Sequence, residues 1–302
     1  MRDPRRCHRY LGLELAGAKN NKTTLATLEF YPKERKVFLL DLHDKIAGAE
    51  DADTRESRES NDEALLALIR ESAEAQEARE AKRSGPGATL LAVNVPLTLP
   101  PCIGCERKTC PLPARCTVPE VKWMQGLTRR LARDRSTKTS GFTPYTQRPV
   151  ELHIRHTVLP EVPQWARFEI DEALGGTKAP LTARMHFLAR HLARVRMPVI
   201  EAWPKLTIAM LAGELGIDRR TLSHYRQLEQ GVHAREVILE RIAQRHEVFI
   251  YERDVRKMTH SLACFDAFVC AFTALLSDQG RCARPPRGFP AGSGWVSHPI
   301  GS

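Results

Sequence analysis

The 302-residue sequence contains no long apolar run, and no stretch approaches the roughly eighteen consecutive apolar residues that a membrane-spanning helix needs. Its first residues, MRDPRRCHRYLGL, lack the apolar core and the small-residue cleavage site of a secretory signal. The sequence also contains no internal repeat, which excludes a solenoid. With 42% apolar and 27% charged residues, it has the composition of an ordinary globular protein. We therefore expect a cytoplasmic protein that has no contact with a membrane.

Segments typical of strands and helices follow one another in a definite order. Three β-rich segments come first and predict an antiparallel meander, since the turn-forming sequence PKER joins the last two. They occupy residues 10–17, 23–32 and 36–46, and they precede an amphipathic helix (49–83), an apolar strand (88–97), a basic helix (122–135), an amphipathic helix (181–193), a short strand (198–204) and the most apolar helix (261–277).

This order predicts an α/β domain of ribonuclease-H-like type, in which a three-strand antiparallel meander and further parallel strands form one mixed sheet with helices on both faces. The domain is expected over residues 10–280, with a cysteine-rich loop at 102–116 and a helical insertion at about 205–255. A basic extension (1–9) precedes it, and a tail rich in Pro and Gly (281–302), expected to be irregular, follows it.

Four of the eight cysteines lie within the fifteen residues CIGCERKTCPLPARC, with the spacing C-x2-C-x4-C-x5-C. In a reducing compartment such a cluster indicates a metal site more than a disulfide framework. Four thiolates suit either Zn²⁺ or a [4Fe-4S] cluster, and reduced cysteines without metal remain the alternative. A role in structure is expected, because four Cys ligands leave no open coordination position. The predicted ligands are Cys102, Cys105, Cys110 and Cys116.

Four polar residues lie inside apolar segments, where a purely hydrophobic core would not place them. They are Glu14 in YLGLELAG, Asn94 in LLAVNVPL, Glu201 in PVIEAWP and Asp266 in SLACFDAFVCAF. Carboxylates are seldom buried unless they are paired or bound to a cation, and a divalent metal is the simplest common partner. In open α/β sheets the ligand site lies at the carboxyl ends of the strands. Oxygen ligands on hard cations such as Mg²⁺ or Mn²⁺ are what metal-dependent phosphodiester hydrolysis uses.

The same motifs resemble the domain of unknown function 429 family, a predicted nuclease family with a ribonuclease-H-like fold, from about Tyr10 to Leu276. The resemblance rests on GLELAG, VNVPLTLP, VIEAWP and FDAFVCAFTAL. Carried over position by position, it implies a catalytic set made of Glu14, Asn94, Glu201 and Asp266. Two positions depart from the family pattern, since Glu14 and Asn94 each stand where the family has Asp. The amide of Asn94 removes one negative charge from the site.

The sequence thus supports three functional hypotheses. The leading one is a Mg²⁺- or Mn²⁺-dependent nuclease that hydrolyses the phosphodiester bonds of nucleic acid. The alternative is a non-catalytic nucleic-acid-binding protein that keeps the fold and the cysteine loop but has lost the metal centre. An actin-like phosphotransferase is the weakest, because the glycines of the first segment are not accompanied by a second glycine-rich phosphate motif.

Positive charge is concentrated between residues 122 and 155, which hold eight Lys or Arg and two acids in a chain of net charge +10. Guanidinium groups bind phosphates, and an aromatic ring among them stacks on bases. The predicted nucleic-acid contacts are Arg129, Arg130, Arg133, Lys138, Tyr145 and Arg148. A solvated surface helix is the alternative for the segment, and an internal ion pair with Glu151 is the alternative for Arg148. A sequence like a helix-turn-helix at 208–227 is interpreted as part of the helical insertion.

Overall fold

One seven-stranded sheet organises the part of the chain that the structure, a computed structural model, describes: residues 7–17, 22–31, 33–44, 46, 55–80, 88–133, 141–195 and 197–301. The strand order is β6-β3-β2-β1-β4-β5-β7. The strands are β1 (Cys7–Glu14), β2 (Thr24–Tyr31), β3 (Lys36–His43), β4 (Ala88–Val93), β5 (Val199–Ala202), β6 (Val248–Phe249) and β7 (Val296–Ser297). The predicted α/β class with a mixed sheet is confirmed.

Strand direction determines which side chains meet at each edge of the sheet. β1, β2 and β3 pair as the predicted antiparallel meander. β1 pairs with β4 in parallel, and β4 pairs with β5 in parallel. Because the carboxyl ends of parallel strands meet at one edge, Glu14 at the end of β1, Asn94 just after β4 and Glu201 in β5 all lie toward that edge.

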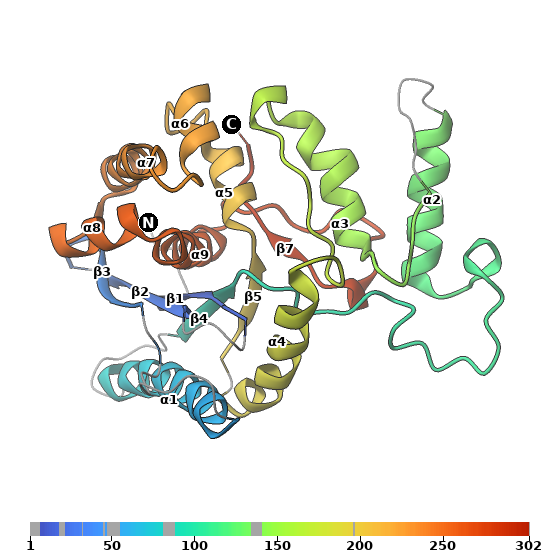
Figure 1. Ribbon diagram of the computed structural model, residues 1–302, viewed down its shortest axis with the longest axis horizontal. Helices are drawn as coiled ribbons and strands as arrows, with labels where there is room; N and C mark the ends of the chain where they lie inside the picture. Colours follow the sequence, from blue (N-terminus) through green and yellow to red (C-terminus); the bar gives the residue numbers. More distant parts are fainter. Residues whose placement is uncertain are drawn as a thin grey trace.

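Helices cover both faces of the sheet, as predicted (Figure 1). They are α1 (Arg55–Glu80), α2 (Pro119–Arg133), α3 (Pro149–His153), α4 (Lys178–Leu192), α5 (Pro204–Leu211), α6 (Arg219–His224), α7 (Gly231–His246), α8 (Glu252–His260) and α9 (Leu262–Asp278). In Figure 1, α1 and α4 lie on one side of the sheet, and α7, α8 and α9 lie on the other.

Each face of the sheet has its own hydrophobic core, because alternate residues of a strand point to opposite faces. In β1, Tyr10 belongs to the core beneath α9, whereas Leu11 and Leu13 belong to the core beneath α1 and α4. The apolar sequence of α9 is explained by its position, since most of its residues are buried. A strand that is buried on both faces has a continuous apolar sequence, which is why β1 and β4 could be predicted.

Gly12 sets the distance between β1 and α9. A Cβ atom at this position would lie 2.0 Å from the Ala267 carbonyl oxygen and 2.3 Å from the Ala271 backbone nitrogen. The strand therefore approaches the helix backbone more closely than any other residue would allow. This close packing brings Asp266, in the first turns of α9, over the end of β1, where Glu14 lies.

Helix α2 and the cysteine-rich loop stand apart from the sheet, with α3 lying between them and the main body (Figure 1). A small separate core joins α2 to the segment around α3 and consists of Met124, Leu127 and Leu152. The arginines of α2, Arg129, Arg130 and Arg133, are exposed.

The structure corrects the sequence interpretation at both ends of the domain. Residues 7–9 of the predicted basic extension belong to β1, where Arg9 forms a buried ion pair with Glu29. The tail is mostly without regular structure, as predicted, but Val296 and Ser297 form β7, which pairs in parallel with β5. The two-residue strand β6 lies within the expected helical insertion and pairs with β3. Strands this short leave no recognisable periodicity in a sequence.

Within the described residues, no single helix is long and apolar enough to cross a membrane. α8 and α9 reach the required length and composition only as a pair, and the pair is bent by 116°.

Candidate functional site

The first two predicted site residues, Glu14 and Asn94, are in direct contact at the carboxyl edge of the sheet. The backbone N–H of Asn94 donates to the Leu13 carbonyl oxygen at 3.1 Å, which extends the β1–β4 pairing by one residue. The side-chain Nδ2 of Asn94 donates to Oε2 of Glu14 at 2.7 Å. An aspartate at this position would repel Glu14, whereas the amide stabilises it with a hydrogen bond.

Asp266 lies close enough to Glu14 for the two carboxyl groups to interact electrostatically. Its side chain is almost fully buried, at 2% exposure. Nη1 of Arg226 donates to both carboxylate oxygens of Asp266, at 3.0 and 2.9 Å. Arg226 follows α6 in the helical insertion, and its side chain is 32% exposed. The insertion thus supplies an internal cation to the carboxylate that the sequence predicts to bind a metal.

Glu201 is held in a separate, fully buried network. Arg148 donates to both carboxylate oxygens of Glu201, from Nη1 and from Nη2, each at 2.8 Å. Two further donors complete the set, namely Nε1 of Trp203 at 2.9 Å and the backbone N–H of Leu97 at 3.1 Å. Glu201 is therefore satisfied without a metal. No interaction described in the structure joins it to Glu14, Asn94 or Asp266.

A cavity of about 230 Å³ opens beside Glu14 and Asn94. Its lining combines three cationic side chains, Lys178, Lys205 and Arg226, with the aromatic rings of Phe168 and Trp203. Nζ of Lys178 donates to the Asn94 carbonyl oxygen at 3.1 Å. Nζ of Lys205 lies 5.8 Å from the centre of the Phe168 ring. Two acids, Glu169 and Asp171, contribute to the lining from an exposed loop segment.

Glu14, which lines the cavity, is protonated at neutral pH. The pKa of Glu14 is raised from 4.5 to about 8. Desolvation is the largest cause, and the neighbouring Asp266 acts in the same direction. Lys178, the Asn94 hydrogen bond and Arg226 oppose that rise. Burial also raises the pKa of Asp266, while Arg226 acts in the opposite direction. Because Glu14 is neutral, it does not offset the positive charge of Lys178, Lys205 and Arg226 in the cavity.

In this structure, the side chains predicted to bind metal already have partners within the protein. Asn94 presents its amide hydrogens to Glu14, Arg226 occupies Asp266, and Arg148 occupies Glu201. Across the residues that the structure describes, no three His, Cys, Asp or Glu side chains are arranged so that they could hold a metal ion. The expectation of Mg²⁺ or Mn²⁺ at this edge therefore stays a prediction from sequence.

The four clustered cysteines all lie in the loop between β4 and α2. Cys105 and Cys110 are exposed, Cys102 is partly buried and Cys116 is buried. All four are free thiols. Burial raises the pKa of Cys102, and the other three thiols also raise it, which means that each of the three lies within electrostatic reach of Cys102.

The basic segment divides into an exposed part and a buried part. Arg129, Arg130 and Arg133 are exposed on α2, and the Tyr145 side chain is 55% exposed. Lys138 lies outside the described residues. The prediction that Arg148 contacts nucleic acid is wrong, because its side chain is fully buried between Glu151 and Glu201. The alternative interpretation of Arg148 as an internal partner of Glu151 is confirmed, with Nε donating to Oε1 at 2.8 Å.

Sequence reasoning missed the three cations of the cavity. Lys178 contacts a residue 84 positions away, and Arg226 contacts a residue 40 positions away. Lys205 follows Pro204 at the beginning of α5. The only local signal was the position of Lys205 directly after a strand that ends at the carboxyl edge, in the sequence VIEAWPK.

Comparison with known proteins gives one match. The chain matches the family model described as protein of unknown function (DUF429) over residues 60–290. No curated protein and no solved structure matches the chain. The matched range contains Asn94, the cysteine loop, Glu201 and Asp266, whereas Glu14 precedes it. Since the match covers more than half of the sequence, the chain belongs to the DUF429 family of proteins of unknown function.

Proposed function

We propose that this protein binds nucleic acid without a two-metal catalytic centre, and that it seats a backbone phosphate in the cavity at the carboxyl edge of the sheet. The observation that carries the proposal is the convergence of Lys178, Lys205 and Arg226 on the place where the carboxylates are already neutralised. Cationic side chains in a partly enclosed cavity attract phosphate more strongly than they would on an open surface.

The two aromatic residues of the cavity favour nucleic acid over a simple inorganic anion. The rings of Phe168 and Trp203 line the same cavity as the three cations. Stacking of bases on aromatic rings next to a positively charged groove is the usual way in which single strands are bound without sequence preference. A strand end or a single-stranded segment therefore suits this cavity better than a duplex.

The strand arrangement supports the proposal of a ribonuclease-H-like fold. In support of it, the three antiparallel strands β1, β2 and β3 and the parallel strands β4 and β5 share one sheet, in the order β3-β2-β1-β4-β5. Nucleic acid would then approach the edge at which that fold type is expected to hold its acidic residues. In this chain the edge carries an amide, a protonated glutamate and an arginine-bound aspartate.

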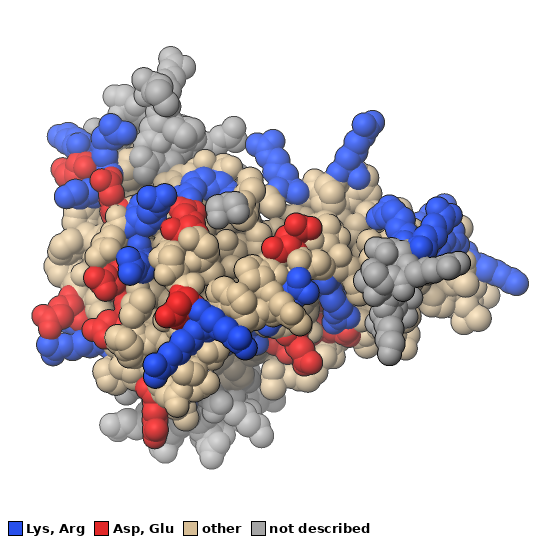
Figure 2. Space-filling view, turned by 90° about the horizontal axis from the view of Figure 1, so that it is seen from above, with Lys and Arg blue, Asp and Glu red and all other residues tan. Residues whose placement is uncertain are grey.

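Helix α2 would provide a second contact. In Figure 2, Lys and Arg gather at the end of the molecule formed by α2 and the cysteine-rich loop, and no Asp or Glu is visible there on this face. The exposed residues of this patch are Lys122, Arg129, Arg130 and Arg133. Charges on an exposed helix contribute to affinity and to association rate in a salt-dependent way, without reading sequence.

The proposal is tested by fluorescence anisotropy with labelled single- and double-stranded DNA and RNA in EDTA. We expect Lys178→Met and Lys205→Met each to weaken binding about three- to tenfold and to lower the slope of log K against log salt by about one. Lys36→Met is the matched control, because Lys36 is an exposed lysine of β3 that does not line the cavity. Equal effects of all three substitutions would contradict the assignment to the cavity.

A metal-dependent nuclease is the second candidate, and one observation favours it. Glu14, at the end of β1, and Asp266, in the first turns of α9, are neighbouring carboxyl groups, and the carboxyl ends of the strands are the usual position of a ligand site. The same oligonucleotides are therefore incubated with Mg²⁺ and with Mn²⁺, using the wild-type protein and Asp266→Asn. Binding without cleavage supports the first candidate. Cleavage that requires the metal and disappears in Asp266→Asn would replace it with the second.

A further inference from the structure

The loop that joins β4 to α2 is long, and most of its hydrogen bonds to the rest of the protein lie in its first part, at Asn94, Leu97, Thr98 and Cys102. It spans residues 94–118, and its one regular element is a 3-10 turn at Pro113–Arg115. The backbone N–H of Cys102 donates to the Pro144 carbonyl oxygen at 3.0 Å, whereas the bond from Cys116 to Pro113, at 3.2 Å, lies inside the loop's own 3-10 turn. The Gln125 side chain of α2 also donates to the Pro113 carbonyl oxygen. Loops of this length without secondary structure of their own are uncommon in compact domains unless they have a function.

Burial of apolar side chains holds the start of the loop, where Val95 is fully buried, but it does not explain how the middle of the loop keeps its shape. Ile103 is 50% exposed and Leu112 is 69% exposed. Leu112 also has a φ angle of 66°, in the left-handed region that residues other than glycine seldom adopt. A loop with exposed apolar residues and a strained backbone position requires a cross-link of another kind to hold one conformation.

The four cysteines of this loop are available for such a cross-link. Their thiols are free, and Cys105, Cys110 and Cys116 each lie within electrostatic reach of Cys102. In the part of the chain that the structure describes, no hydrogen bond is formed by any of the four sulfur atoms. They differ in this from Asp266 and Glu201, whose oxygens already have arginine partners.

We propose that Cys102, Cys105, Cys110 and Cys116 bind one Zn²⁺ through four thiolates and thereby close the loop against the start of α2. Each thiol loses its proton on binding, so the apparent affinity rises with pH. Among the described residues, no three His, Cys, Asp or Glu side chains are close enough together to hold a metal ion, so the four sulfur atoms do not surround one point in the structure. Zinc binding therefore includes a movement of the loop.

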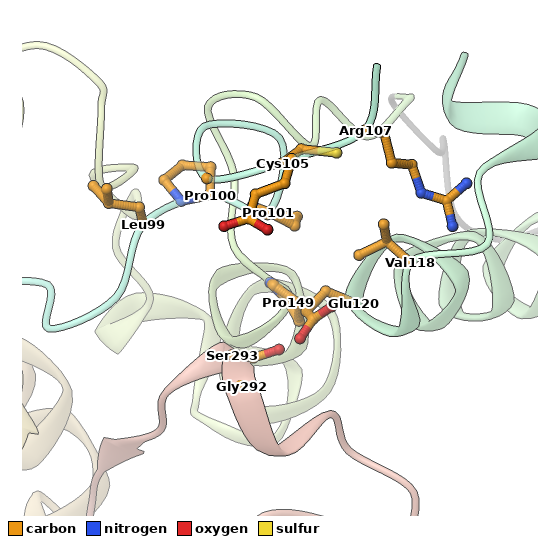
Figure 3. A pocket seen from close by; sticks show the side chains of 12 residues that line it. Leu99, Pro100, Pro101, Cys105, Arg107, Val118, Glu120, Pro149, Gly292 and Ser293 are labelled. Atoms are coloured by element: carbon orange, nitrogen blue, oxygen red, sulfur yellow. The ribbon is translucent and has the colours of Figure 1, made fainter. Parts of the chain in front are cut away.

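The structure has room for this movement. A cavity of about 530 Å³ separates the loop from α2 and from the C-terminal segment. Figure 3 shows Cys105 and Pro101 on the loop side of this cavity, with Glu120 of α2 and Ser293 of the C-terminal segment across from them. Because few contacts hold the middle of the loop, its closure would break little existing structure.

Zinc fits this loop better than an iron–sulfur cluster does. Cys105 and Cys110 are exposed, and the loop has no apolar cover that would keep solvent away from a cluster. Solvent exposure makes iron–sulfur clusters labile and alters their potentials, whereas tetrahedral zinc sites are redox-inert and common in small surface loops. A structural site is also expected because four protein ligands leave no position for substrate.

The first test measures metal in the full-length protein, purified without metal-affinity chromatography, by mass spectrometry of the elements. We expect one zinc per chain in the wild type, and less than about a tenth of that amount in Cys105→Ser and in Cys110→Ser. The control is Cys282→Ser, which removes a partly buried thiol outside the loop and should keep the zinc. Absence of zinc from the wild type, or its retention in both loop variants, would overturn the proposal.

A second test uses the wild-type chain and does not depend on the folding of any variant. Replacement of zinc by Co²⁺ should give the intense visible absorption of a tetrahedral site and a thiolate charge-transfer band in the near ultraviolet. Zinc should also protect the four loop thiols from alkylation, as mapped by peptide mass spectrometry. A weak octahedral cobalt spectrum, unprotected loop thiols, or iron with sulfide in place of zinc would each overturn it. None of these measurements depends on nucleic-acid binding.

Discussion

The protonation state of Glu14 gives the sharpest test of the site, because a metal centre requires an ionised carboxylate there. Burial and Asp266 raise the pKa of Glu14 to about 8, against an ordinary value of 4.5. At about 1.4 kcal/mol per pKa unit, this shift corresponds to about 5 kcal/mol. Glu14 faces a cavity that water can enter, so we expect less than half of this value, about 2 kcal/mol, in the folding free energy.

The sign of the pH dependence follows from proton binding. Below pH 4.5, Glu14 is protonated in both the folded and the unfolded chain, so its contribution is fully present. Between pH 4.5 and about 8, the unfolded chain releases this proton while the folded chain keeps it, and the free energy of unfolding therefore falls. Glu14→Gln imitates the protonated form, and the glutamine oxygen can still accept the Asn94 hydrogen bond.

Urea unfolding in EDTA at pH 4.5, 6.5 and 8.5 measures this effect. We expect Glu14→Gln to match the wild type at pH 4.5 and to be about 2 kcal/mol more stable at pH 8.5. His153 and His246, whose pKa values burial lowers to about 4, make stability rise with pH over this range. That rise is common to both proteins and is removed by subtracting one curve from the other. Identical pH dependence of the two proteins would refute the reasoning.

Three further predictions concern the groups that build the site. Arg148→Met should destabilise the fold by about 3–5 kcal/mol, because it leaves the carboxylates of Glu151 and Glu201 buried without their cationic partner. Arg256→Met, at an exposed pair with Glu252, should change the free energy of urea unfolding by about 0.5 kcal/mol or less. Gly12→Ala should destabilise the fold by at least about 3 kcal/mol, since the new Cβ would overlap backbone atoms of α9. Its control is Gly126→Ala, in a helix with open space at that position, which should stabilise the fold by about 0.5–1 kcal/mol in the same assay. Asp171→Asn should tighten oligonucleotide binding about two- to fivefold in anisotropy measurements by removing a negative charge from the cavity lining, and weaker binding would show that Asp171 contacts the ligand.

The elements of the fold were predictable because their signals are local. The apolar runs of β1 and β4, the PKER turn and the apolar α9 each reflect burial of neighbouring residues, so the sequence predicted both their type and their order. The two-residue strands β6 and β7 were not predictable, since pairing with a strand far away in the chain, rather than any pattern of their own, defines them.

The candidate site was predictable in part, for the same physical reason. Buried polar residues stand out in an apolar sequence, and this signal led to Glu14, Asn94 and Asp266, which the structure places close to one another. The partners of such residues carry no comparable signal. Arg226 and Lys178 come from distant segments, and only tertiary packing brings them into contact with Asp266 and with the Asn94 backbone.

The central claim is that cations of the protein, rather than a bound metal, hold a nucleic-acid phosphate at the carboxyl edge of the sheet. The most direct measurement is the salt dependence of single-stranded oligonucleotide binding in EDTA, compared between wild type, Lys36→Met and the double variant Lys178→Met/Lys205→Met. The account predicts that wild type and Lys36→Met bind without metal. It also predicts that the double variant reduces the magnitude of the slope of log K against log salt by about two. Binding that requires added Mg²⁺, or an unchanged slope in the double variant, would contradict it.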